Sequence, residues 1–202
     1  MHCRHRPGRI ARVSLRELKK DRTRRAIADA ATHLFAEHGF DAVTVADIAG
    51  AAEVAPRTVH RYFPDKQEIL FFEEDHLRDV VAATLDSTPP QASGAELARA
   101  VGAVLAERLE GRRAAVAARQ RLIESSPALR ARDIAKHAAM EDLLTEHLAR
   151  RWGLDADRDV RPRWWAGAGR ACFVSAYRVW LAEGGRLRDH VDTAIALLPP
   201  GP

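Results

Sequence analysis

The densest group of side chains able to bind another molecule lies in the segment PRTVHRY, residues 56–62. Its guanidinium, hydroxyl, imidazole and phenol groups can donate hydrogen bonds to base edges and to phosphate oxygens. Val59 and Phe63 are apolar and four residues apart, so a helix would bury them and leave the polar groups outside. The chemistry indicated is contact with duplex DNA. The outward-facing set is Arg57, Thr58, His60, Arg61 and Tyr62.

A second short helix is expected just before this segment, over TVADIA at residues 44–49. Thr44 stands ahead of an apolar stripe at helical spacing, where its hydroxyl can cap free backbone N–H groups. Residues 51–54 form the bend. Pro56 suits the first turn of the next helix, because its missing N–H would have no partner there. The pair reads as a helix–turn–helix, with one packed face and one face for the major groove.

From about Arg22 to Leu70 the sequence resembles the TetR-type bacterial transcriptional regulators. Three segments carry the resemblance, and an aromatic-Phe pair followed closely by Lys is the most specific part. The resemblance implies an all-α protein with an N-terminal three-helix helix–turn–helix domain and a C-terminal helical ligand-binding and dimerisation domain. The segments are LFAEHGF (34–40), TVADIA (44–49) and VAPRTVHRYFPDKQEIL (54–70), the last containing Tyr62-Phe63 and Lys66.

Two positions depart from the family pattern. Glu53 occupies a turn position where Gly is common, and Ala55 stands where a Ser would cap the recognition helix. A non-Gly residue at positive φ and a lost cap each cost about 1 kcal/mol. We expect a slightly weakened turn and an unchanged fold.

The DNA contacts are assigned from residue chemistry together with the resemblance. Arg57 and Arg61 are expected at base edges or phosphates, and Thr58 and His60 at bases. Thr44, Tyr62 and Lys66 are expected to hold the phosphate backbone. The complete predicted DNA-binding set is Thr44, Pro56, Arg57, Thr58, His60, Arg61, Tyr62 and Lys66.

The charge distribution supports this placement. Residues 1–66 hold 13 Lys and Arg against 8 Asp and Glu, whereas the remaining residues hold 19 against 20. The positive excess therefore lies in the part with the helix–turn–helix, where it would add affinity through counterion release. Basic residues also coat N-termini for solubility, so charge alone leaves both readings open.

We expect a flexible basic N-terminus over residues 1–18, a DNA-binding domain over 19–66 and a helical ligand-binding and dimerisation domain over 67–202. A long helix is predicted from Asp65 to Leu85, ending before the loop STPPQASG. No segment alternates with period two, so no sheet is expected. The further predicted helices begin near Ala95, Arg112, Pro127, Val160 and Leu187.

An enzyme is the first competing class. His137 and Glu141 are four residues apart and could face the same way, but a helix-surface ion pair explains them better than a catalytic pair. Cys172 lies in an apolar helix and is read as packing. His2, Cys3 and His5 have no further ligands nearby, so no metal site is expected. We predict no enzymatic activity and no cofactor.

The second alternative is a constitutive or architectural DNA-binding protein without an effector. Against it stands the size of the body, which exceeds what a DNA-reading head needs. A cavity with aromatic and Arg walls would suit a bulky apolar ligand with an anionic group, and the 55–64 segment is similar to a TetR branch associated with acyl-CoA sensing. Aromatic residues at this spacing can equally form core. The candidate wall residues are Arg119, Arg121, Trp164, Tyr177 and Trp180.

Small residues in the segment 166–171 leave a smooth patch where another helix could come close, although they could also serve packing within one chain. With the resemblance, this predicts a homodimer through the last two long helices. The prediction is therefore a cytoplasmic, ligand-released repressor that binds palindromic operator DNA as a homodimer. No apolar run is long enough for a membrane span.

Overall fold

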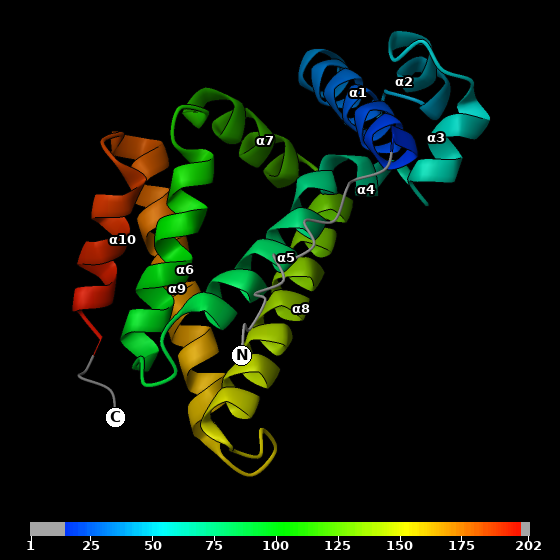
Figure 1. Cartoon of the computed structure of the whole chain (residues 1–202). Coiled ribbons are helices and arrows are strands. Elements are labelled where there is room, and N and C mark those ends of the chain that lie inside the picture. The colour runs from blue at the N-terminus through cyan, green and yellow to red at the C-terminus, as the bar shows by residue number, and fades with distance from the viewer. Residues whose placement is uncertain (1–14, 199–202) are drawn as a thin grey trace, which may run out of the picture.

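The computed structural model describes the backbone of residues 15–198 and the side chains of residues 18–72 and 76–198. This part of the chain forms helices α1 to α10 and contains no strand (Figure 1), so the all-α prediction is confirmed. Helix α1 begins at Leu15, so the predicted flexible segment is too long at its C-terminal end. Residues 1–14, which include His2, Cys3 and His5, lie outside the described residues, so the expectation of no metal site there is untested.

Three helices form the head: α1 (Leu15–His38), α2 (Val45–Ala51) and α3 (Pro56–Tyr62). Gly39 ends α1 at φ 81°, a backbone conformation that glycine adopts without a steric penalty. The predicted apolar stripes all face one common core. Its buried members from these helices and their turns are Ile27, Ala31, Phe35, Phe40, Val43, Ile48, Ala49, Val59 and Phe63.

The predicted helix from Asp65 to Leu85 is two helices, α4 (Lys66–Leu70) and α5 (Phe72–Ser87). The break falls at Phe71, whose side chain is 0% exposed. Arg119 Nε donates to the carbonyl of Leu70 at 3.3 Å, and its guanidinium lies 4.9 Å from the Phe71 ring centroid. Burial of the Phe71 ring and an outside donor for the Leu70 carbonyl replace the continuous helix that periodicity alone predicted.

The body contains α6 (Gly94–Leu109), α7 (Arg113–Ser125), α8 (Pro127–Trp152), α9 (Val160–Glu183) and α10 (Leu187–Ala196). These bounds agree with the predicted helices to within two residues. Punctuating residues explain the agreement: proline opens α8, and Gly153 closes it at φ 64°.

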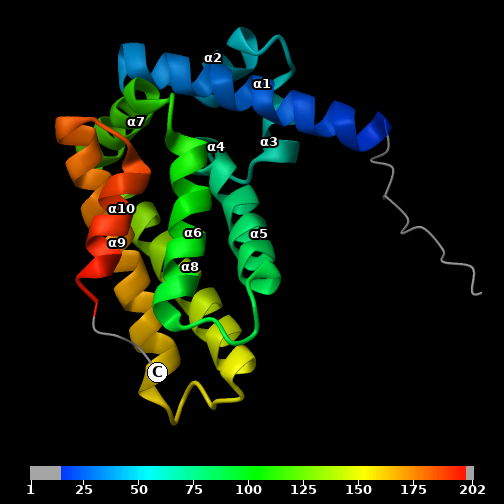
Figure 2. The ribbon, with the colours of Figure 1, turned by 60° about the vertical axis from the view of Figure 1, so that its left-hand side comes forward.

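The body helices pack in two layers. Figures 1 and 2 show α6, α9 and α10 on one side, and α5 beside α8 on the other. Helix α7 crosses between the body and α1. None of the helices in the described part has the length and apolar character that a membrane span requires.

The head core continues into the body. Ile69, Leu70, Phe71 and Phe72 pack in the same buried cluster as the head residues, and Ile123 and Leu129 join it from α7 and α8. The predicted division after Lys66 therefore cuts through this cluster, which extends to Phe72. The predicted boundary was placed at the end of the sequence motif, whereas the extent of the core is determined by side-chain packing.

Candidate DNA interface and effector cavity

Thr44 caps α2, as predicted, in a reciprocal arrangement with Asp47. The Thr44 hydroxyl accepts from Asp47 N at 3.2 Å and donates to Asp47 Oδ2 at 2.6 Å. Thr44 N donates to the same oxygen at 2.8 Å. The Thr44 hydroxyl and backbone N–H together lower the pKa of Asp47. Both Thr44 donors are thus engaged, so a phosphate contact by Thr44 would have to replace one of these bonds.

The turn between α2 and α3 has the two irregularities that the sequence predicts. Glu53 is a non-glycine residue at φ 53°. Ala55 is the N-cap of α3 and supplies no side-chain bond, while Pro56 occupies the first helical turn. The start of α3 therefore depends on proline and on packing.

Helix α3 divides its side chains as predicted. Val59 is 1% exposed and Phe63, which follows the helix, is 2% exposed. Arg57, His60 and Arg61 are exposed on the other side. Thr58 and Tyr62 are half-buried, and the Arg61 guanidinium lies 5.0 Å from the Tyr62 ring centroid. In Figure 1, α3 lies at the edge of the head, away from the body.

Lys66 has a structural role that the sequence did not predict. Its Nζ donates to the carbonyls of Phe40 at 2.6 Å and Val43 at 2.8 Å, and lies 4.2 Å from the Phe40 ring centroid. It therefore ties the loop between α1 and α2 to the start of α4. Replacing Lys66 would loosen this loop as well as remove a charge, so the predicted phosphate contact cannot be isolated by that substitution.

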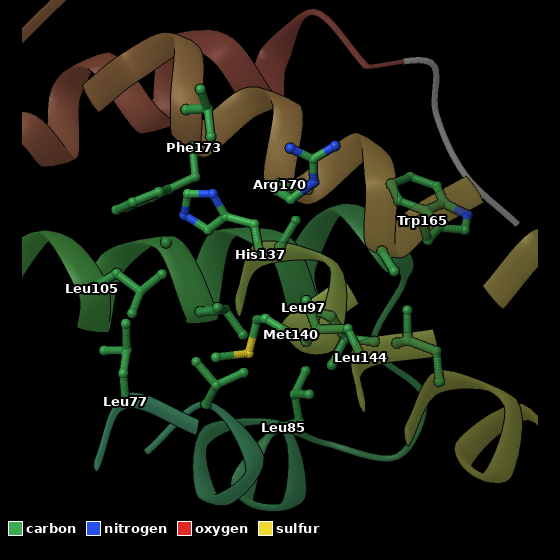
Figure 3. A pocket seen from close by; sticks show the side chains of 18 of the residues that line it. Leu77, Leu85, Leu97, Leu105, His137, Met140, Leu144, Trp165, Arg170 and Phe173 are labelled. Carbon is green, nitrogen blue, oxygen red and sulfur yellow. The ribbon is translucent and has the colours of Figure 1, made fainter. Parts of the chain in front are cut away.

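A cavity of about 200 Å³ lies between α5, α6, α8, α9 and α10. Figure 3 shows its apolar walls together with the cluster of His137, Arg170 and Phe173 between α8 and α9. An apolar cavity of about 150 Å³ is enough to hold benzene, so this one can take a small apolar molecule. The main apolar side chains are Leu77, Leu85, Leu97, Leu105, Met140, Leu144 and Trp165.

A larger, more polar pocket of about 830 Å³ adjoins the cavity, and we call it the vestibule. Leu77, His137, Arg170 and Phe173 line both spaces. Six arginines and two aspartates are among the described residues of the vestibule. An elongated ligand could thus place an apolar part in the cavity and an anionic part toward the vestibule. The arginines are Arg25, Arg108, Arg112, Arg119, Arg170 and Arg178.

Comparison with known proteins gives the family. Residues 27–71 match the family described as "Bacterial regulatory proteins, tetR family", and residues 94–201 match the "MftR C-terminal domain". The chain belongs to the TetR family. Its members are transcriptional regulators.

Two relatives extend over most of the chain. The HTH-type transcriptional regulator TcmR of Streptomyces glaucescens is 33% identical over 172 residues, covering 82% of this chain and 76% of that protein. The putative mycofactocin biosynthesis transcriptional regulator MftR of Mycobacterium tuberculosis is 30% identical over 166 residues, covering 82% and 83%.

A solved TetR-family structure has the same fold. The Thermus thermophilus repressor FadR, in complex with lauroyl-CoA, is 24% identical with a TM-score of 0.53, covering 89% of this chain and 97% of that chain. At this identity the similarity concerns the fold alone.

The predicted wall residues do not line the cavity. Arg119 and Tyr177 line the vestibule. Trp180 is buried in a core formed with α6 and α10, Arg121 is exposed on α7, and Trp164 is 47% exposed on the outside of α9. Aromatic residues of one helix point in several directions, so their number predicted a hydrophobic core more reliably than a pocket.

The sequence did contain a signal for the cavity that was missed. Lys136, Met140, Leu144 and Leu148 recur every four residues on α8, and all four line the cavity. A cation within an otherwise apolar helical stripe is unusual, because lysine is rarely buried without a partner. This pattern, rather than the aromatic residues, indicated the wall of the cavity.

The predicted His137–Glu141 ion pair is wrong. His137 Nδ1 lies 3.5 Å from Asp133 Oδ2, and Arg170 Nε donates to Glu141 Oε2 at 2.7 Å. No group of three or more potential metal ligands occurs among the described residues. Cys172 is buried, as predicted, and burial raises the pKa of its thiol.

Proposed function

We propose that this TetR-family protein is a repressor that binds palindromic operator DNA as a homodimer and leaves it when an apolar, anionic effector binds. The carrying observation is the combination of an exposed donor face on α3 with an apolar cavity that ends at cationic side chains. Such a protein acts where chromosomal DNA lies, in the cytoplasm.

The proposed operator contacts follow the exposure of α3. Arg57, His60 and Arg61 are free to approach base edges or phosphates, with Thr58 and Tyr62 at the margin of the face. Seven residues of helix suit insertion of one end of α3 into the major groove. Thr44 is exposed at the start of α2 and Lys66 is half-buried at the start of α4, and phosphate contacts are proposed for both.

The proposed dimer forms through the outer face of α9. Its exposed stripe includes Trp164, Ala171, Ser175, Val179 and Ala182, spaced as one side of a helix. Trp164 and Val179 are both nearly half exposed, so a partner subunit that covers them would remove apolar surface from water.

The small residues of α9 have mixed orientations. Ala166 is buried, and a side chain on Gly169 would contact Ala98 of the same chain. Part of the predicted smooth patch therefore packs within one chain. The proposed interface therefore uses the exposed stripe of α9, where two copies of the helix could meet in a helical bundle.

The proposed effector is a single apolar chain with an anionic head. The cavity supplies the apolar walls, while Lys136, His137 and Arg170 supply positive or proton-donating groups at its lining. The lauroyl-CoA bound to the Thermus FadR is a ligand of this chemistry in a protein of the same fold.

Selection of DNA from a random pool by the purified protein tests the proposal. The expected product is a palindrome whose half-sites are about one helical turn apart. Fatty acids and acyl-CoA thioesters are then titrated against the selected duplex. Release by one of them supports the effector role. Non-palindromic DNA would overturn the dimer, and retention of DNA with every ligand would favour a constitutive regulator.

A further inference from the structure

Three basic side chains of the cavity lining, Lys136, His137 and Arg170, lie against carboxylates of the protein. Arg170 pairs with Glu141 and His137 with Asp133, and both carboxylates belong to α8. Lys136 differs, because its Nζ donates at 3.0 Å to Glu68 Oε2 on α4. This pair thus joins the cavity to the helix that continues the DNA-binding head.

Glu68 is held from two sides. Arg132 Nε donates to its Oε1 at 2.6 Å, while Lys136 binds the other oxygen. The side chains of Glu68 and Lys136 are only 13% and 19% exposed, so solvent screens this pair weakly. Arg132 does not line the cavity, whereas Lys136 does.

Helix α4 links this pair to the head. Lys66, two residues before Glu68, binds the loop between α1 and α2. Ile69, Leu70 and Phe71, directly after Glu68, are buried in the head core. A weaker contact between α8 and Glu68 would therefore loosen α4, the helix against which the head packs.

We propose that Lys136 senses the negative charge of the effector by exchanging partners. This inference rests on the proposed function, because it assigns the regulation of the same cavity. An anionic head that reaches Lys136 competes with Glu68 for its ammonium group and repels the Glu68 carboxylate. The contact between α4 and α8 weakens, which favours the conformation released from DNA.

Linkage gives this exchange a distinctive signature. If Glu68 and the effector compete for Lys136, removing the Glu68 charge strengthens binding of an anion, and removing the Lys136 charge weakens it. If the ion pair had only a structural role, both substitutions would change the anion affinity in the same direction, because the loss of either charge would damage the cavity. A neutral ligand of equal length should be indifferent to both changes.

The test uses decanoate and 1-decanol as matched probes, with binding to the full chain measured by calorimetry. Glu68→Gln should raise decanoate affinity about three- to tenfold, and Lys136→Gln should lower it about tenfold, as expected for a close, weakly screened charge pair. Affinity for 1-decanol should stay within about twofold in both variants. Asp142→Asn, which removes an exposed pair with Arg163, is the control and should change neither affinity.

The proposed exchange would be overturned if the decanoate affinity changed in the same direction in both variants. It would also be overturned if the affinity for 1-decanol changed as much as that for decanoate. Binding of 1-decanol without decanoate would also overturn it, while leaving an apolar effector cavity in place. If neither probe binds, the proposed effector class fails and this inference with it. Thermal unfolding of each variant shows whether the fold is intact.

The operator gives a second readout. Decanoate should weaken binding to the selected duplex in the unmodified chain, and the ratio of operator affinities with and without decanoate should approach one in Glu68→Gln. A ratio as large as in the unmodified chain, with decanoate bound, would show that release does not pass through this pair and would overturn the proposal.

Discussion

The DNA-facing surface and the effector cavity are assembled in opposite ways. The DNA-facing residues all lie within one short helix, residues 56–62, so neighbours in sequence are also neighbours in space. The cavity collects side chains from α5, α6, α8, α9 and α10. A surface built by local geometry can be read from a motif, whereas one built by tertiary packing needs the relative positions of several helices.

The largest expected effect tests whether the two regions are energetically separate. Phe71→Ala removes a fully buried ring at the break between α4 and α5 and should cost about 3–5 kcal/mol of unfolding free energy. Tryptophan fluorescence in denaturant is the measurement, because all four tryptophans of the chain lie in the body.

The body signal should shift by the full amount if head and body unfold together. An unchanged tryptophan transition would mean that the head unfolds alone, and the shared core would then not couple them. Leu197→Ala is the matched control, because this side chain is 83% exposed and its loss should change stability by less than about 0.5 kcal/mol.

The next effect concerns the DNA-facing surface alone. Arg57→Ala should weaken binding to the selected duplex by about 1–3 kcal/mol if Arg57 reads a base, and it should change sequence preference. Competition between selected and random duplexes gives both quantities. Arg158→Ala, in the exposed turn before α9, serves as the control for loss of positive charge. Equal weakening on both duplexes would reassign Arg57 to a phosphate.

A smaller effect is expected from filling the cavity. Met140→Trp places a larger side chain among the cavity walls and should weaken decanoate binding about tenfold, with operator affinity in the absence of ligand changed less than about twofold. Met140→Leu conserves volume and should bind nearly as the unmodified chain does. Normal decanoate affinity in the Trp variant would place the ligand elsewhere.

The smallest effect compares two equivalent caps. Thr44–Asp47 begins α2 in the head, and Ser93–Glu96 begins α6 in the body, each with reciprocal hydrogen bonds. Thr44→Ala and Ser93→Ala should each cost about 1 kcal/mol of stability. Gel-shift titration should detect weaker operator binding only for Thr44→Ala. A loss of DNA affinity in both variants would mean that general stability, and not the phosphate contact, controls it.

The same caps predict a dependence on pH. Hydrogen bonds from Thr44 and Ser93 lower the pKa values of Asp47 and Glu96 from their ordinary 3.8 and 4.5. Each carboxylate therefore contributes its full stabilisation above its ordinary pKa and loses it as the pH falls through the lower folded-state value. Acid unfolding curves of the two alanine variants should be flatter over this range. Unchanged curves would contradict the capping contribution.

Much of the fold could be predicted because the residues that begin and end its helices act locally. Gly39, Pro127 and Gly153 end or begin helices through backbone preferences that act within a turn. The positive φ of Glu53 and the missing cap at Ala55 were expected because both positions depart from the TetR family pattern. The inward and outward sides of α3 followed from the spacing of Val59 and Phe63.

The break at Phe71 and the cavity could not be predicted in this way. Periodicity is continuous through Phe71, and the break depends on Arg119, which is remote in sequence. Trp164 and Trp180 lie on one helix but on different sides of it, one exposed and one buried. Only the packing of α6 and α10 against α9 distinguishes them. The structural role of Lys66 could not be predicted either, because the carbonyls that it binds, those of Phe40 and Val43, are remote in sequence.

The extent of the head core has a consequence for exchanging parts among family members. A chimera joined after Lys66 would give one parent's Ile69–Phe72 segment to another parent's α1 and α2, and mismatch the most buried side chains. A junction after Phe72 keeps that cluster with its native neighbours. A head that is to respond to a foreign body would then need the body residues that contact this cluster or Glu68 transplanted with it. Among the described residues these include Arg119, Leu122, Ile123, Leu129, Arg132 and Lys136.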